Sequence, residues 1–154
     1  MREKRRQIAS EERTRLVLAA ESMAKIREHL QVSYPEEACG GLLGHITEES
    51  VAVVEAVSLA NAREAERRRR YLIGPNDVLE MERRAEGLGL QVVGYYHSHP
   101  DAPPVPSEFD REHAWPWYTY LIASVENGRL TRSQAWRLTD DRERFVPLQL
   151  TEEK

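Results

Sequence analysis

Apolar residues recur every three or four positions in two stretches of the chain, which is the spacing of one helix face. The first stretch follows Ser10, whose hydroxyl can cap a helix, and it predicts a helix from Glu11 to Leu30. Its apolar stripe consists of Leu16, Ala19, Met23, Ile26 and Leu30. The second stretch opens at Pro75, a residue that suits the first helical turn, and ends at Gly87. The pattern therefore predicts two amphipathic helices.

Runs rich in β-branched and aromatic residues predict strands in the rest of the chain. They cover residues 36–44, 51–59, 90–99, 117–125, 130–138 and 145–150, and residues 71–73 are a candidate short strand. Residues 45–50 and the Asn127-Gly128 pair are expected to be hairpin turns, and a short helix should run from Ser107 to Ala114. This order predicts an α/β fold with a central mixed β-sheet flanked by helices. We expect one domain of residues 11–150 after a polar N-terminal extension of residues 1–10.

The composition is that of a soluble globular protein. Of the 154 residues, 40% are hydrophobic and 31% are charged, and the net charge of -4 argues against a dedicated nucleic-acid-binding protein. Cys39 is the only cysteine, which excludes an intrachain disulfide and suits a reducing compartment. No apolar run approaches the roughly 20 residues that a membrane-spanning helix needs, and the basic N-terminus lacks the apolar segment of a signal peptide. We therefore expect a cytoplasmic protein.

The stretch of residues 94–110, GYYHSHPDAPPVPSEFD, contains the candidate chemistry. Alternate residues of a strand point to the same face, so His97 and His99 can reach one ion. Asp110 follows Ser107 by three residues, and in a helix that starts at Ser107 it can approach the two histidines. Two imidazoles and a carboxylate are typical of a catalytic zinc site whose fourth position is open to water. The Ser107-x-x-Asp110 spacing also fits a helix capping box, and both readings can hold together.

These residues resemble the signature of the JAMM (MPN+) metalloprotease family: a His-Ser-His triplet, seven residues, a serine, two residues and an aspartate. An upstream segment from Glu37 to Gly44, reading EACGGLLG, is similar to the remaining element of that family. The resemblance implies that His97, His99 and Asp110 ligate Zn²⁺, that Glu37 is the general acid/base, and that Ser107 hydrogen-bonds the oxyanion or the bound water. It also implies a layout like that of cytidine deaminase.

The family resemblance further implies a zinc-dependent isopeptidase or peptidase of the stand-alone prokaryotic branch. Such an enzyme cleaves after the C-terminal Gly-Gly of a ubiquitin-like protein, and the prokaryotic branch is linked to sulfur carriers of that fold. The competing hypothesis is a non-catalytic MPN-type scaffold that binds a ubiquitin-like partner. The metal-free scaffolds lack the ligand set that this chain keeps. The sequence leaves open which carrier is the substrate and what the cut releases, and the apolar stripe of the first helix permits a homodimer.

Several residues near the motif have two readings. Glu36 and Glu55 compete with Glu37 as the base, because the strand period cannot choose between adjacent residues. Cys39 is either a nucleophile served by His97 or a small buried residue, and we favour the second reading because cysteine is commonly buried. The arginine run at residues 67–70 either attracts an acidic partner or lies on a solvated loop. The aromatic residues of 115–120 are divided between a substrate groove and the core.

Overall fold

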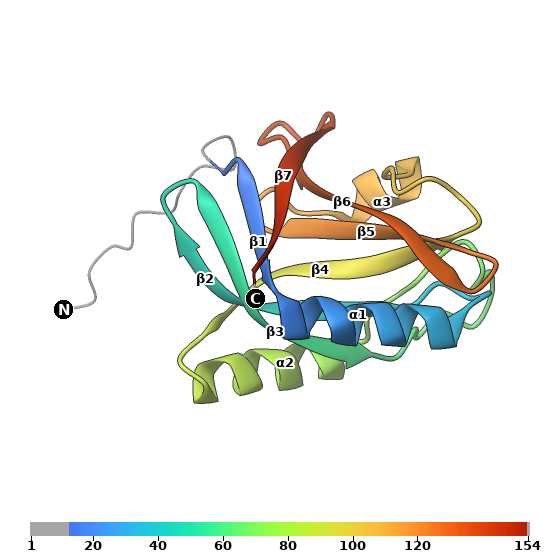
Figure 1. The fold of residues 1–154 in the computed structure, drawn as a ribbon, viewed down its shortest axis with the longest axis horizontal. Helices are drawn as coiled ribbons and strands as arrows, with labels where there is room; N and C mark the ends of the chain where they lie inside the picture. Colours follow the sequence, from blue (N-terminus) through green and yellow to red (C-terminus); the bar gives the residue numbers. More distant parts are fainter. Residues whose placement is uncertain (1–12, 154) are drawn as a thin grey trace.

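Seven strands form one closed sheet in the computed structural model, which describes residues 13–153 (Figure 1). The elements in chain order are β1 (Arg15–Ala19), α1 (Ala20–Ser33), β2 (Cys39–Thr47), β3 (Ser50–Leu59), α2 (Pro75–Gly87), β4 (Gln91–Pro100), α3 (Glu108–His113), β5 (Thr119–Glu126), β6 (Arg129–Leu138) and β7 (Phe145–Glu153). The strands follow one another around the barrel as β1-β3-β2-β4-β5-β6-β7. The sheet is mixed, because β1 runs parallel to both its neighbours and β4 runs parallel to β5, whereas the other pairs are antiparallel.

Strand β4 is hydrogen-bonded to β2 on one side and to β5 on the other. Its last four residues before Pro100 are all buried, including His97, Ser98 and His99. Gly94 allows β5 to approach, since a Cβ atom on this residue would lie 1.9 Å from the carbonyl oxygen of Thr119. The strand that carries the two candidate histidines is therefore fixed along both edges.

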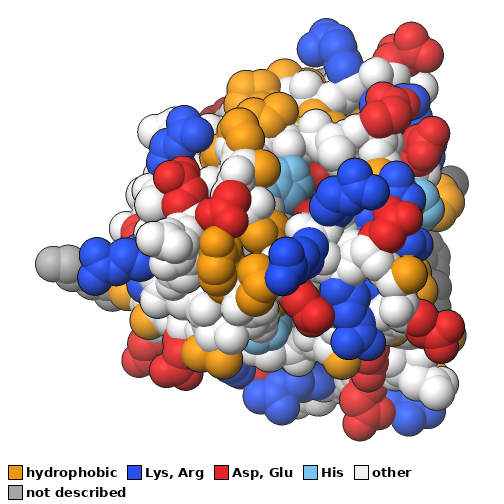
Figure 2. Space-filling model, turned by 90° about the vertical axis from the view of Figure 1, so that its right-hand side faces the viewer, with side chains coloured by type: hydrophobic (Ala, Val, Ile, Leu, Met, Phe, Trp, Pro, Cys, Tyr) orange, Lys and Arg blue, Asp and Glu red, His pale blue; other side chains and the backbone are white. Residues whose placement is uncertain are grey.

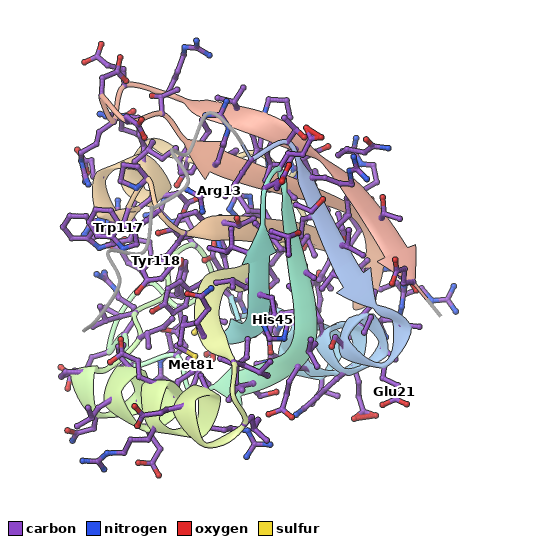
Figure 3. The ribbon with its side chains drawn as sticks, turned by 90° about the vertical axis from the view of Figure 1, so that its left-hand side faces the viewer. Arg13, Glu21, His45, Met81, Trp117 and Tyr118 are labelled. Atoms are coloured by element: carbon purple, nitrogen blue, oxygen red, sulfur yellow. The ribbon has the colours of Figure 1, made fainter. Side chains whose placement is uncertain are left out.

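The helices α1 and α2 pack on opposite faces of the sheet. Leu42 and Leu43 are neighbours on β2 and point to opposite sides, one into the main core with α1 and the other into a smaller cluster with α2. Met81 lies between α2 and the strands (Figure 3). The buried stripe of α1, made of Met23, Ile26 and Leu30, belongs to the core of this chain, so it offers no surface to a second copy.

The predicted helix from Glu11 to Leu30 is wrong over its first turns. Residues 15–19 form β1, in which Leu16 and Leu18 are buried and their neighbours are not. This alternation has the period of a strand, and β1 closes the barrel by pairing with both β3 and β7. The helix itself begins at Ala20 and ends at Ser33. Ser10, the extension of residues 1–10 and the first two residues of the predicted helix lie outside the described residues.

The other elements follow the prediction, with shifted ends. The first hairpin strand begins at Cys39 instead of residue 36, and its turn comprises residues 48–49. Residues 71–73 are not a strand, because Leu72 is hydrogen-bonded to Asn61 and Ala62 of its own loop instead of to a sheet edge. The mixed sheet and its helices are as expected, whereas closure of the sheet was not predicted. No helix of the described part combines the length and the apolar character needed to cross a bilayer.

Candidate metal centre

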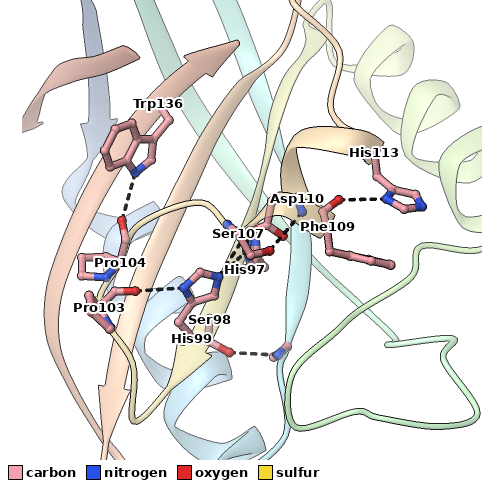
Figure 4. A network of polar contacts seen from close by, with 11 residues as sticks. His97, Ser98, His99, Pro103, Pro104, Ser107, Phe109, Asp110, His113 and Trp136 are labelled. Carbon is pink, nitrogen blue, oxygen red and sulfur yellow. Dashed lines mark hydrogen bonds and ion pairs between the residues drawn. The ribbon is translucent and has the colours of Figure 1, made fainter. Parts of the chain in front are cut away.

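Three polar side chains converge where β4 ends and α3 begins (Figure 4). His97 and His99 come from one face of β4, and their Nε2 atoms are 3.2 Å apart. The Oδ2 atom of Asp110 lies 3.4 Å from the first of these nitrogens and 3.3 Å from the second. The histidines are 1% and 8% exposed, so the triangle of donor atoms is largely withdrawn from solvent. The structure thus brings together the three residues that the sequence motif singled out.

The size of this triangle fits a tetrahedral metal ion. An ion with bonds of about 2.0–2.1 Å in tetrahedral geometry holds its ligand atoms roughly 3.3–3.4 Å apart. The three separations, 3.2, 3.3 and 3.4 Å, agree with that spacing. Two nitrogens and one carboxylate oxygen are also a donor set that suits Zn²⁺. These residues can therefore hold the ion and leave a fourth position for water.

The hydrogen bonding of His99 directs a lone pair toward the triangle. Its Nδ1 atom lies 2.9 Å from the carbonyl oxygen of Pro103, which can only accept, so Nδ1 is the donor. A neutral ring then presents its Nε2 lone pair to Asp110, another acceptor. Two acceptors at this distance attract each other only when a proton or a metal cation lies between them. Such an outer hydrogen bond is the usual way in which proteins orient a metal-binding histidine.

His97 is held differently. Its Nδ1 atom is buried and has no hydrogen-bond partner among the described residues. Instead the ring of Tyr71 stacks on the imidazole, with centroids 4.5 Å apart and planes inclined by 28°. The stacking fixes the plane of the His97 ring. In His99 the hydrogen bond to the Pro103 carbonyl does the same. Tyr71 belongs to the loop of residues 60–74, and the sequence pattern assigned it no role in the site: residues 71–73 were expected as a candidate short strand after a charged loop.

Asp110 occupies the third position of α3, where it also caps the helix. Its backbone N–H donates to Ser107 Oγ at 3.0 Å, and its Oδ2 atom accepts from the Ser107 N–H at 2.9 Å. The capping-box reading and the ligand geometry therefore hold in the same residue. Because the Ser107 hydroxyl accepts from the helix, its own proton is free to point elsewhere, and the side chain is exposed at the edge of the triangle.

The electrostatics of Asp110 and His97 favour the protonation states that bind a metal. Burial opposes ionisation of Asp110, but the two histidines and the Ser107 N–H outweigh it and keep the pKa of that carboxyl well below its usual value. Burial lowers the pKa of His97. Burial would also lower the pKa of His99, but hydrogen bonds to Asp110 and to the Pro103 carbonyl raise it above the ordinary value. An ionised carboxylate beside a neutral His97 is the form that coordinates a metal cation.

Glu37 is buried close to the triangle, in the segment between α1 and β2. It is only 5% exposed, whereas its neighbour Glu36 is exposed. Burial, reinforced by the charge of Asp110 and opposed by that of His99, raises the pKa of Glu37 to about 8. The third candidate, Glu55, forms an ion pair with Arg84 on α2. Of the three glutamates that the sequence left open, Glu37 is the one whose charge acts on the triangle.

Cys39 has the properties of a buried structural residue. Burial, followed by the nearby carboxylates of Glu37 and Asp77, raises the pKa of its thiol to about 12. Cys39 pairs with His97 across β2 and β4, but its sulfur lies 3.7 Å from the carbonyl oxygen of Ala60, its hydrogen-bond acceptor. The thiolate is the nucleophilic form of cysteine, so a thiol with this pKa does not support the cysteine-hydrolase reading.

A cleft of about 320 Å³ opens beside Asp110. Its walls are mainly aromatic and aliphatic and come from Tyr71, Leu72, Ile73, Val78, Tyr95, Phe109, His113, Trp115, Tyr118 and Tyr120. Figure 2 shows this side of the molecule, with histidine recessed among apolar and charged side chains. Trp117 lies outside the cleft and stacks on Trp115, and the loop that carries both is held by Arg13 through the carbonyl oxygens of Pro116 and Trp117. Trp115, Tyr118 and Tyr120 thus line the cleft, as one part of the prediction expected. Trp117 lies neither in the cleft nor in the core.

Comparison with known proteins gives consistent matches along the chain. Residues 19–139 match the family model described as prokaryotic homologs of the JAB domain. A curated relative from Haloferax volcanii, named desampylase, is 37% identical over 141 residues, covering 88% of this chain and 98% of the relative. A solution structure from Salinibacter ruber is 37% identical, with a TM-score of 0.70, and covers 89% of this chain and 91% of that chain. A solution structure from Desulfitobacterium hafniense, with a TM-score of 0.79 and 23% identity over 90% of this chain and 93% of that chain, shares the fold.

Proposed function

The chain belongs to the family of prokaryotic JAB-domain homologs, and from this premise we propose that it is a zinc-dependent isopeptidase acting on ubiquitin-like protein conjugates. The observation that carries the proposal is the triangle of His97, His99 and Asp110, whose dimensions suit a tetrahedral ion. The relative named desampylase supports the choice of a hydrolase over other zinc enzymes. The bond that is cut follows the C-terminal Gly-Gly of the ubiquitin-like protein, for which a sulfur carrier is our candidate.

In this proposal His97, His99 and Asp110 hold the zinc ion, which when bound polarises the scissile carbonyl and acidifies the attacking water. Glu37 takes the proton from that water and delivers it to the leaving amine. A carboxyl group whose burial raises its pKa toward neutrality suits both transfers, because it can accept and release a proton near pH 7. Ser107 donates its free hydroxyl proton to the carbonyl oxygen as negative charge develops there.

The cleft beside Asp110 is the proposed path of the substrate tail. A Gly-Gly terminus has no side chains, so it can approach the triangle between the loop of residues 60–74 and α3 without steric conflict. An extended tail can also form main-chain hydrogen bonds along such a loop in the manner of an added strand. The aromatic walls then contact the residues that precede the two glycines.

The proposal is tested with a ubiquitin-like carrier joined through its terminal glycine either to a lysine side chain or to a peptide. We expect cleavage after Gly-Gly, detected by mass spectrometry, with loss of activity in chelator and recovery with added Zn²⁺. Glu37→Gln should lower kcat by about 10²- to 10⁴-fold without loss of zinc. Cleavage that continues at the same rate in excess chelator would contradict a metal-dependent reaction.

The scaffold hypothesis makes a different prediction for the same protein. A scaffold needs a surface for the ubiquitin-like partner but no buried set of metal ligands. Metal analysis after gentle purification therefore separates the two: about one zinc per chain supports the enzyme, whereas less than about half supports a scaffold. The same measurement on Asp110→Asn shows whether bound zinc occupies the triangle.

A further inference from the structure

Glu37 needs an external support because it lies outside the helices and strands. Position is critical for a catalytic group, and a displacement of about 1 Å can cost roughly 100-fold in rate. On one side, the next residue, Ala38, exchanges hydrogen bonds with Ser98 of β4, at 2.9 Å and 3.0 Å. On the other side, the partners of the Glu37 backbone among the described residues all belong to the loop of residues 60–74. Its N–H donates to the carbonyl oxygen of Arg67 at 2.6 Å, and its carbonyl oxygen accepts from Asn61 Nδ2 at 3.0 Å.

Asn61 uses the full hydrogen-bonding capacity of its carboxamide. Its Nδ2 group donates to the carbonyl oxygens of Glu37 and Arg70, both at 3.0 Å. Its Oδ1 atom accepts from the backbone N–H groups of Arg63 at 3.0 Å and Leu72 at 3.1 Å. Two donors and two acceptor sites are all that an asparagine side chain offers. One side chain therefore ties both ends of the loop to each other and the loop to Glu37.

The same loop also contacts both elements that supply the metal ligands. Tyr71 stacks on His97. It follows Arg70, whose carbonyl oxygen accepts a hydrogen bond from Asn61. The guanidinium of Arg70 lies 4.4 Å from the centroid of Phe109, which precedes Asp110 on α3. Ring contacts thus anchor the loop to β4 and α3, which we call the ligand side. The carboxamide of Asn61 anchors the loop to the segment that carries Glu37, which we call the base side. Asn61 is the point at which the two sides are joined.

We infer that Asn61 is a positioning residue, which sets the place of the Glu37 carboxyl relative to the metal ligands. The inference rests on the proposed function, in which Glu37 is the general acid/base. Asparagine is required because the position needs two donors and two acceptors at once. Aspartate offers no donors, and alanine offers neither, so both substitutions release the Glu37 carbonyl. Neither substitution removes a hydrogen bond of His97, His99 or Asp110.

The first test measures whether Asn61 restrains the backbone at Glu37. In Asn61→Asp and in the neutral variant Asn61→Ala, we expect the Glu37 N–H to lose protection from hydrogen exchange in NMR, while the amides of β4 keep theirs. Asn76→Asp makes the same charge change at an exposed position on α2 and should leave the Glu37 amide as in the wild type. Unchanged protection in both Asn61 variants would overturn the inference without any reference to activity.

The second test separates positioning from substrate binding and from folding. We expect both Asn61 variants to lower kcat by about 10- to 100-fold, with little change in KM and with the zinc content of the wild type. A rise in KM at unchanged kcat would overturn the inference, because the loop would then serve the substrate tail. Glu37→Asp already displaces the carboxyl, so adding Asn61→Ala to it should cause no further fall in kcat. If the two residues acted independently, their separate fold-reductions in kcat would multiply.

The outcomes distinguish this inference from the proposal on which it rests. If Glu37→Gln keeps the wild-type kcat, the role of Glu37 is wrong and the proposed mechanism fails first. If Glu37→Gln is inactive and Asn61→Ala has wild-type kcat, only the role of Asn61 fails. Lower kcat in both, with an unprotected Glu37 amide and normal zinc, supports both statements.

Discussion

The two sides of the candidate site are held by different kinds of structure. His97 and His99 lie on β4, which is hydrogen-bonded along both edges, and Asp110 lies in a helix closed by a capping box. Glu37 lies in an irregular segment, and a loop without helix or strand supports it through single hydrogen bonds. The ligand side is therefore part of the folded core, whereas the base side depends on a few contacts between segments that are far apart in sequence.

This difference predicts how each side responds to change. A change on the ligand side should alter metal binding or the stability of the whole domain, because β4 cannot move without β2 and β5. A change on the base side should alter turnover and local exchange while the domain stays folded. In the proposed mechanism, regular structure holds the residues that would bind the ion, and a small hydrogen-bond network positions the group that would transfer the proton.

The largest effect is expected when the ligand side is broken without disturbing its helix. Asp110→Asn keeps an oxygen that can accept from the Ser107 N–H but removes the negative charge that faces both histidines. We expect zinc to fall from about one to well below half per chain, with cleavage reduced to the level of chelated protein. Asp141→Asn, in an exposed turn, is the matched control. Full zinc content in Asp110→Asn would show that the ion binds elsewhere.

On the base side, Glu37 should make the free energy of unfolding depend on pH. Burial raises the pKa of Glu37 from its ordinary value of 4.5 to about 8, so between these values the folded chain binds a proton that the unfolded chain releases. The free energy of unfolding of chelated protein should therefore fall as pH rises through this window. Glu37→Gln removes this term and should gain about 2–4 kcal/mol relative to the wild type between pH 5 and pH 9. Urea unfolding measures this, and parallel pH profiles would contradict it.

A smaller effect should come from the packing that holds β4 in place. In Gly94→Ala the added methyl group meets the Thr119 carbonyl at 1.9 Å, so β4 and β5 must separate. We expect a loss of about 1–3 kcal/mol in the free energy of unfolding. Gly87→Ala, at the end of α2 with open space around its Cβ position, should cost nothing or stabilise by up to about 1 kcal/mol. Equal stabilities of the two variants would argue against a rigid ligand side.

The smallest effect is expected from the contact that joins the loop to α3. Arg70→Gln removes the cation–π contact with Phe109 but keeps the backbone carbonyl to which Asn61 donates. Such contacts contribute about 0.5–1 kcal/mol at exposed sites, so kcat should fall by no more than about fivefold. Steady-state kinetics measure the change, and the control is Arg69→Gln, which removes an ion pair with Glu66 as Arg70→Gln also does. A loss as large as that of Asn61→Ala would place the main support of Glu37 in α3.

Local patterns in the sequence predicted most of the elements and the three candidate ligands. The period-2 spacing of His97 and His99 and the three-residue spacing of Ser107 and Asp110 each describe one strand or one helix turn, so no long-range information was needed. The helix from Glu11 to Leu30 failed over residues 15–19 because Leu16 continues the helical spacing of the stripe and also alternates with Leu18 in the period of a strand. Only pairing with β3 and β7 decides for the strand.

The sequence by itself determined the strand and helix on which the candidate donors lie, and it predicted the donor set and a short list of glutamates near it. The tertiary structure decided that the sheet closes, that Glu37 is the glutamate buried beside the ligands, and that Asn61 and Tyr71 support the site. The physical reason is that these features depend on contacts across 20 or more residues of chain. A hydrogen bond such as that of Asn61 to Glu37, or a ring stack such as that of Tyr71 on His97, leaves no periodic signal in the sequence.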